Sequence, residues 1–211
     1  MKQILVYGDS LTWGIVPGTR QRLPYADRWP VVLEGELNRG GFAVRIIEDC
    51  LNGRRTVWDD PFKAGRNGLV GIEQRIEVNS PLALVILMLG INDFQSVHQY
   101  TAWQSSQGIA SIVRAIRRAP IEPDMPMPPI LIVAPPRPGQ PTGTMVEKFD
   151  RAPEKSAGMS DAYRAVAVEL DCGFFDADGV IATSRIDGVH LDADQHAQLG
   201  RAIVSTVARF L

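Results

Sequence analysis

The sequence predicts an α/β protein, a three-layer α/β/α sandwich built on one five-stranded parallel sheet. Five short runs are apolar or β-branched without regular polar alternation, as in strands that are covered on both faces. Segments with apolar residues at helical spacing alternate with these runs, and parallel strands need such crossovers. A length of 211 residues suits a single domain, residues 1–211.

The expected strands are short apolar runs bounded by turn residues. The clearest is 82–89, where eight apolar residues follow Pro81 and stop at Gly90. The other four are expected at 4–7, 42–48, 130–134 and 173–176. This regular alternation of strands and helices favours the flavodoxin-like strand order.

The helices that connect these strands are expected at 29–38, 69–78, 108–119, 160–170 and 192–211. Segment 108–119 is the most amphipathic, with isoleucines on one face and arginines on the solvent face. Asp192 is a suitable N-cap for the last helix. Two connections are unusual: 15–27 is expected as a loop over the site, and 135–158 is long enough to be a lid or a subunit interface.

Composition excludes several classes of protein. A net charge of −2 gives no electrostatic footprint for nucleic acid or for an anionic membrane. No apolar run is long enough to span a bilayer, and the first residues lead straight into a strand without a signal peptide, so a cytoplasmic protein is expected. Two cysteines without metal-ligand spacing predict no metal site, and we expect no cofactor.

The first candidate for chemistry is Ser10, in the glycine-bounded stretch GDSLTWG at 8–14. It lies just past the carboxyl end of the first expected strand, on the side where open α/β sheets bind ligands. An ordinary surface turn is the alternative, because Gly, Asp and Ser are common turn residues.

A catalytic serine needs a base and a group that orients the base. Of the three histidines, only His190 lies in a glycine-containing turn with a carboxylate, Asp187, three residues before it. The sequence therefore predicts a triad of Ser10, His190 and Asp187, although the last two could form only a local hydrogen-bonded pair. His98 and His196 are expected in surface or packing roles.

The oxyanion donors are expected from turns at the same edge of the sheet. Gly53 and Asn92 each follow a strand end, so the backbone N–H groups of Ser10 and Gly53 and the side-chain amide of Asn92 are the candidates. Asn92 could instead merely hold its turn. Trp13 and Phe94, close in sequence to Ser10 and Asn92, are expected to bind substrate by lining an apolar approach to the acyl group, although Trp13 could instead belong to the core.

Together these stretches resemble a known family. GDSL at 8–11, the glycine of NGR at 52–54, GIND at 90–93 and DGVH at 187–190 are similar, in that order, to the four sequence blocks of the SGNH, or GDSL, hydrolases. The resemblance implies a metal-free Ser-His-Asp esterase, with Ser10, Asp187 and His190 as the triad and Ser10, Gly53 and Asn92 as the oxyanion hole. The serine does not lie in the Gly-x-Ser-x-Gly elbow of the α/β-hydrolases.

The longer strings GDSLTWG, GRRT with DDP at 59–61, and MLGIND at 88–93 are most similar to the bacterial aryl-esterase/acyltransferase branch. This implies small-molecule ester substrates with short acyl groups, acyl transfer to alcohols or peroxide, and a homo-oligomer, with an octamer suggested. The sequence departs from the branch pattern after Asp93 and within 135–158, which leaves acyl-chain preference and oligomer geometry open.

Other functions stay open at this point. A carbohydrate acetylesterase and a lysophospholipase or thioesterase use the same catalytic groups. No residue of the sequence indicates recognition of a sugar, a long acyl chain or a pantetheine group. A different class is a flavodoxin-like module that binds a small anion on the backbone donors of Ser10 and Gly53. Such a module needs no base, so the pair of Asp187 and His190 favours an enzyme.

Overall fold

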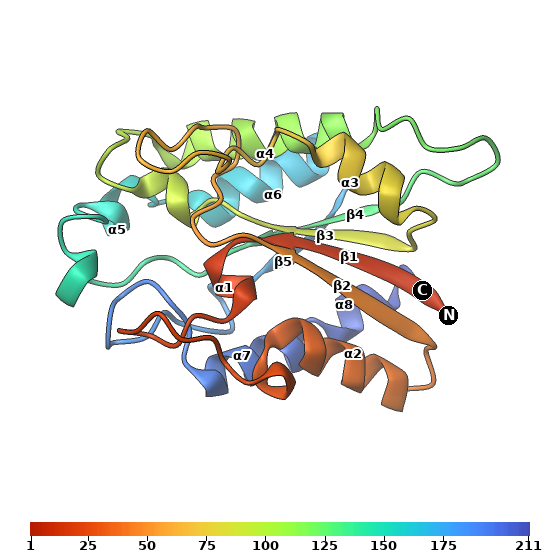
Figure 1. The fold of residues 1–211 in the computed structure, drawn as a ribbon, viewed down its shortest axis with the longest axis horizontal. Coiled ribbons are helices and arrows are strands. Elements are labelled where there is room, and N and C mark those ends of the chain that lie inside the picture. Colours follow the sequence, from red (N-terminus) through yellow and green to blue (C-terminus); the bar gives the residue numbers. More distant parts are fainter.

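A parallel sheet of five strands forms the centre of the computed structural model, which describes residues 1–211 (Figure 1). In spatial order, β2–β1–β3–β4–β5, the strands are Val44–Cys50, Lys2–Gly8, Leu84–Met88, Ile130–Ala134 and Gly173–Asp176. This is the flavodoxin-like order, so the predicted fold class is confirmed. The strand order reverses between β1 and β3, and open sheets bind ligands beyond the carboxyl ends of the strands at such a point.

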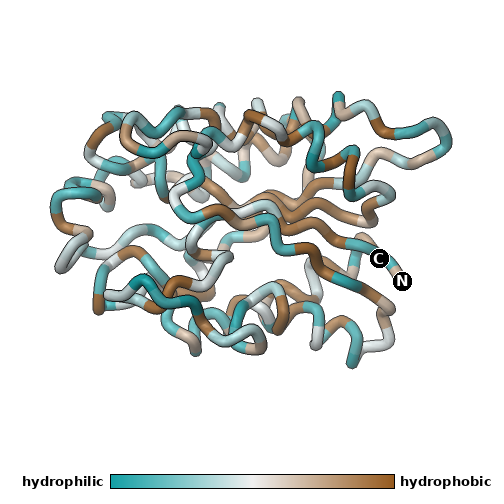
Figure 2. Tube along the Cα trace, in the orientation of Figure 1, coloured by the Kyte–Doolittle hydropathy of each residue, from teal (hydrophilic) through white to brown (hydrophobic).

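The central strands β1, β3 and β4 are apolar because both faces of the sheet are covered there, whereas the edge strands β2 and β5 are mostly half-buried. Ile4, Leu5 and Val6 of β1 have no exposed surface, and all of β3 is buried. Figure 2 shows these central strands as the most hydrophobic part of the chain, with polar residues along the outer helices. The unbroken apolar runs of the sequence are therefore explained by burial on two sides.

Helices cover both faces of the sheet (Figure 1). One layer holds α2 (Trp29–Arg39), α7 (Ala193–Ala202) and α8 (Val204–Ala208), and the other holds α3 (Ile72–Asn79), α4 (Ala102–Ile116) and α6 (Met159–Glu169). Two short helices, α1 (Ser10–Trp13) and α5 (Ala152–Lys155), follow β1 and precede α6. None of the helices combines the length and the apolar character that a bilayer crossing requires.

The helix expected at 69–78 begins three residues later, at Ile72, and two other helices differ more from their expected bounds. The first is α4, which begins at Ala102, six residues before the predicted start, because Thr101 and Gln104 form a capping box: the Thr101 hydroxyl accepts the Gln104 N–H, and the Gln104 side chain accepts the Thr101 N–H. The second is the helix expected at 192–211, which is divided into α7 and α8 at Ile203.

The histidines outside the predicted triad have packing contacts. His196 is fully buried between α7 and α2, where its Nδ1 accepts the Trp29 N–H at 3.3 Å. Burial, together with the nearby charges of His190 and Arg28, lowers the pKa of His196 to about 4. His98 stacks on Tyr100 with ring centroids 4.8 Å apart. The expected packing role is confirmed for His196.

The contact between α4 and the loop after β2 leaves no room for a side chain at Gly108. A Cβ atom there would lie 2.2 Å from Thr56 Oγ1, whereas a Cβ atom at Gly35 of α2 would meet nothing within 4 Å. We expect Gly108→Ala to destabilise the protein by about 1–3 kcal/mol through overpacking. The matched Gly35→Ala should stabilise it by about 0.5–1 kcal/mol, because alanine favours the helix.

Urea unfolding of both variants measures this difference. Equal free energies of unfolding for the two variants would contradict a close packing of α4 on the Thr56 loop.

Candidate active site

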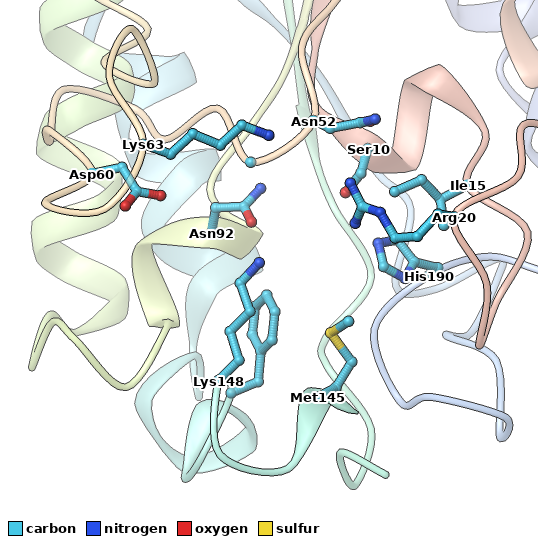
Figure 3. Close-up of a pocket in the computed structure, with 12 residues that line it drawn as sticks. Ser10, Ile15, Arg20, Asn52, Asp60, Lys63, Asn92, Met145, Lys148 and His190 are labelled. Atoms are coloured by element: carbon cyan, nitrogen blue, oxygen red, sulfur yellow. The ribbon is translucent and has the colours of Figure 1, made fainter. Parts of the chain in front are cut away.

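The turns at the carboxyl ends of β1, β2 and β3 meet at a cavity of about 50 Å³ (Figure 3). It brings together four of the predicted site residues from four separate parts of the chain: Ser10, Gly53, Asn92 and His190. The complete lining is Ser10, Ile15, Arg20, Asn52, Gly53, Asp60, Lys63, Asn92, Met145, Lys148, Phe149 and His190. The site therefore lies beside the reversal of strand order between β1 and β3.

Ser10 begins the one-turn helix α1, where the sequence analysis expected only a turn. The Asp9 carboxylate caps this helix by accepting the Leu11 N–H at 2.9 Å, and Gly14 ends it with a left-handed φ of 84°. Ser10 lines the cavity, although the residue is only 5% exposed. The backbone N–H groups of Ser10 and Gly53 donate to no group of the protein, which leaves both available to a ligand.

Asp187 fixes His190 through three hydrogen bonds. Asp187 Oδ1 accepts the backbone N–H groups of Val189 and His190, each at 2.9 Å, and Oδ2 lies 2.7 Å from His190 Nδ1. Burial alone would raise the pKa of Asp187, but the hydrogen bonds from His190 and Val189 hold it well below its usual range. Because Nδ1 is engaged by an ionised carboxylate, Nε2 is the ring nitrogen left for chemistry in the cavity.

The same carboxylate also holds the loop that covers the site. Asp187 Oδ2 accepts the Gly18 N–H at 3.1 Å, and Ile15 and Arg20 of this loop line the cavity. The expected position of segment 15–27 over the site is confirmed. The structure records no hydrogen bond between Ser10 Oγ and His190, a contact that often tightens only when substrate binds.

The Asn92 amide ties three turns together. Its Nδ2 donates to Asp9 Oδ2 at 3.0 Å and to the Arg54 carbonyl at 3.2 Å, so the turns after β1, β2 and β3 are joined at one group. Burial raises the pKa of Asp9 to about 7, although the hydrogen bonds from Leu11 and Asn92 oppose the rise. The bonds to Asp9 and to the Arg54 carbonyl already engage both hydrogens of the Asn92 amide, the predicted oxyanion donor.

Gln95 sets the orientation of this amide, a role that its sequence neighbourhood does not indicate. Gln95 Nε2 donates to Asn92 Oδ1 at 2.7 Å, and Gln95 Oε1 accepts from Arg55 Nη2 at 2.8 Å. Arg55 is fully buried and forms an ion pair with Asp60, with Nη1 and Oδ2 2.6 Å apart. A chain of polar contacts thus runs from the cavity lining at Asp60 to Asn92. No local sequence pattern indicates it, because its members come from two separate connections, the one after β2 and the one after β3.

A third buried carboxylate, Asp93, holds the turn that carries Gly53. It accepts the Thr56 N–H at 3.0 Å, the Thr56 hydroxyl at 2.7 Å and the Ser105 hydroxyl at 2.6 Å. Burial raises the pKa of Asp93 to about 6, and these hydrogen bonds limit the rise. Asp93 therefore links the site both to the loop after β2 and to α4.

The prediction for Phe94 is wrong, and Trp13 also lies outside the cavity lining. Phe94 is fully buried because the 3-10 turn Ile91–Phe94 places its ring in the core. Trp13 is half-buried beneath Arg22, whose guanidinium lies 4.7 Å from the ring centroid. The expected apolar approach is wrong as well, since only three of the twelve lining residues are hydrophobic.

Segment 135–158 packs over the site of its own chain. Phe149 is buried and Met145 is half-buried, and both line the cavity, whereas Val146 is 50% exposed. Its position confirms a covering segment. Packing of this segment against a second subunit stays a prediction.

Removing the Gln95 amide should leave two buried polar groups without a partner. Gln95→Leu deprives Arg55 Nη2 and Asn92 Oδ1 of their hydrogen bonds, so we expect it to lower the free energy of unfolding by about 1–3 kcal/mol. The matched control is Gln99→Leu, because Gln99 is exposed and bonds only to the Ser96 carbonyl. It should change stability by less than about 0.5 kcal/mol.

Chemical denaturation of both variants gives the comparison. A cost for Gln95→Leu no larger than that for Gln99→Leu would contradict this role of Gln95.

Comparison with known proteins agrees with this geometry. A family model described as the GDSL-like Lipase/Acylhydrolase family matches residues 6–198, whereas no curated protein sequence matches. Among solved structures, a carbohydrate acetylesterase family member from Sinorhizobium meliloti is 38% identical, with a TM-score of 0.93 over 100% of this chain and 99% of that chain. The aryl esterase of M. smegmatis, in its inhibitor-bound form, is 31% identical, with a TM-score of 0.94 over 100% of both chains.

A second carbohydrate acetylesterase from Sinorhizobium meliloti is 35% identical, with a TM-score of 0.92 over 100% of both chains. These similarities, together with the cavity that holds Ser10 and His190, identify the group of enzymes to which the chain is related. The chain belongs to the GDSL-like, or SGNH, hydrolase family, as the four sequence blocks indicate.

Proposed function

We propose that the protein is a serine esterase that hydrolyses short-chain acyl or aryl esters through an acyl-enzyme on Ser10. The observation that carries the proposal is the His190 ring, which is held by the ionised Asp187 and shares one small cavity with Ser10. A module that only binds a small anion has no use for an oriented base. The family of the chain supports the same reaction class.

In the first half-reaction, Ser10 Oγ attacks the ester carbonyl carbon while His190 Nε2 takes the hydroxyl proton. Asp187 keeps the other ring proton on Nδ1 and stabilises the imidazolium that forms. The carbonyl π electrons move to oxygen and then return, breaking the bond to the leaving alkoxide. His190 gives its proton to that oxygen, and the alcohol departs.

In the second half-reaction, water replaces the alcohol. His190 accepts a proton from water as the water oxygen attacks the acyl carbon, and the bond to Ser10 Oγ then breaks. The proton returns to Ser10, and the carboxylic acid leaves. An alcohol in place of water would give acyl transfer by the same steps, since the triad serves either nucleophile.

The negative charge on the carbonyl oxygen needs donors that are already in place. The unpaired backbone N–H groups of Ser10 and Gly53 are two of them. Asn92 Nδ2 is the third, and its longer hydrogen bond, at 3.2 Å to the Arg54 carbonyl, is the one that the oxyanion would replace. The bonds to Asp9 and from Gln95 would keep the amide oriented during this exchange.

The cavity favours a short acyl group. A volume of about 50 Å³ beside Ser10 suits an acetyl group far better than a fatty acyl chain, which argues against a lysophospholipase or a long-chain thioesterase. A carbohydrate acetylesterase is the second candidate. It is supported by two similar structures of that description and by a lining that is mostly polar.

Labelling of the nucleophile tests the proposal directly. A fluorophosphonate should add one covalent group to the wild-type protein, at Ser10, detected by intact mass and peptide mapping. Ser10→Ala should show no adduct and should lose at least about 10⁴-fold in kcat on 4-nitrophenyl acetate. His190→Ala should slow both reactions, because the serine loses its base.

Ser111→Ala is the matched control, since Ser111 lies on α4 outside the cavity, and it should behave as the wild type. Adduct formation or near-normal turnover by a folded Ser10→Ala protein would overturn the assignment.

A further inference from the structure

We propose that Lys63 and Lys148, assisted by Arg20, bind a carboxylate carried by the alcohol portion of the ester substrate. The inference rests on the proposed esterase function and names a substrate class for it: short acyl esters of alcohols or phenols that bear an anionic group.

Three cationic side chains line this cavity, and none of them has an anionic partner. Arg20, Lys63 and Lys148 take part in no ion pair, and their side-chain nitrogens donate no hydrogen bond within the protein. The carboxylate of the lining, Asp60, is already paired with the buried Arg55. Burial works to raise the pKa of Asp60, but the bond from Arg55 and the Phe62 N–H lower it overall, so Asp60 is ionised and its charge is committed to Arg55.

The positive charge is local and is felt within the cavity. The whole chain carries a net charge of −2, so these cations do not reflect a basic protein. Partial withdrawal from water lowers the pKa of Lys148. The charge of Asp60 opposes this effect, and the charges of Arg20, Arg55 and Lys63 lower the pKa further. Like charges that face one small space repel each other, and a bound anion would relieve that repulsion.

The cations surround the reacting groups. Figure 3 shows the ammonium groups of Lys63 and Lys148 reaching toward Asn92 from opposite sides, with Arg20 beside Ser10 and His190. A substrate whose carbonyl lies at Ser10 would thus place its neighbouring atoms near these charges. Lysine suits this task because its ammonium is a point charge on a flexible stem, which adapts to carboxylates in different positions.

The two lysines also decide which side of the ester carries the anion. Lys63 and Lys148 line both the catalytic cavity, of about 50 Å³, and a neighbouring cavity of about 480 Å³ that includes Phe62 and Val97. The smaller space at Ser10 has room for a short acyl group. The alcohol portion therefore extends past the lysines into the larger space, where a carboxylate would meet them.

A matched pair of substrates tests the inference. 4-Acetoxybenzoate and its neutral methyl ester carry the same acetyl group, and the para carboxylate is too distant to attack the ester itself. The ratio of their kcat/KM values, each divided by the hydroxide-catalysed rate of the same ester, isolates the effect of the anion. We expect the wild type to prefer the anionic ester at least tenfold.

The variants are Lys63→Gln, Lys148→Gln and the double variant. The preference should fall several-fold in each single variant and approach one in the double variant, because the substitutions remove the charges that meet the carboxylate. Arg45→Gln is the control, since Arg45 is exposed on β2 and lines neither cavity. It should keep the wild-type preference. Added salt, 0.5 M NaCl, should reduce the wild-type preference through screening.

The outcomes separate this inference from the function on which it rests. Hydrolysis of the neutral ester without a preference for the anionic one would overturn the inference alone, as would a preference that persists in the double variant. If neither ester is hydrolysed and Ser10 is not labelled by the fluorophosphonate, both the proposed function and this inference fail.

Discussion

The hydrogen bonds of the Asn92 amide are the contacts on which the arrangement of the site depends. Through them the turn after β3 is joined to Asp9, beside Ser10, and to the Arg54 carbonyl, beside Gly53. The parallel sheet brings these turns to one edge, but it does not set their spacing to within a hydrogen bond. A single side chain with two donors and one acceptor does so, and Gln95 fixes which way that side chain faces.

Buried carboxylates also hold the turns and loops of the site in position. Asp9 caps the helix of Ser10, Asp93 holds the loop of Gly53, and Asp187 holds both His190 and the loop at Gly18. Burial raises the pKa of Asp9 and Asp93 because ionising a carboxyl group away from water is costly, and the donors around each group offset part of that cost. The site is thus built from polar contacts, set on a sheet that is held by apolar packing.

The fold could be predicted from the sequence because its signal is local. The unbroken apolar runs of β1 and β3, together with the glycine-containing turns after β1, β2 and β3, place Ser10, Gly53 and Asn92 at one edge of the sheet. The spacing of Asp187 and His190 predicts their pairing. Phe94 could not be placed from the sequence, because a 3-10 turn decides whether its ring faces the cavity or the core.

The cationic lining of the cavity could not be predicted from the sequence either. Arg20, Lys63 and Lys148 come from three loops that are far apart in the chain, and only the folded packing of those loops brings them to one space. The contacts of Arg55 with Asp60 and Gln95 depend on the same packing. Hydrophobic periodicity predicts helices and strands. The positions of loops relative to one another depend on contacts between residues that are distant in sequence, and these contacts produce no periodic pattern.

The central claim is that Asn92 joins the turns so that its amide can serve the oxyanion in the transition state. Steady-state kinetics of Asn92→Ala on 4-nitrophenyl acetate, with folding checked by circular dichroism, test it most directly. The account predicts that kcat falls by about 10²–10³ while KM changes only a few-fold, since the lost bond is made mainly in the transition state. A folded variant with a raised KM and an unchanged kcat would contradict it.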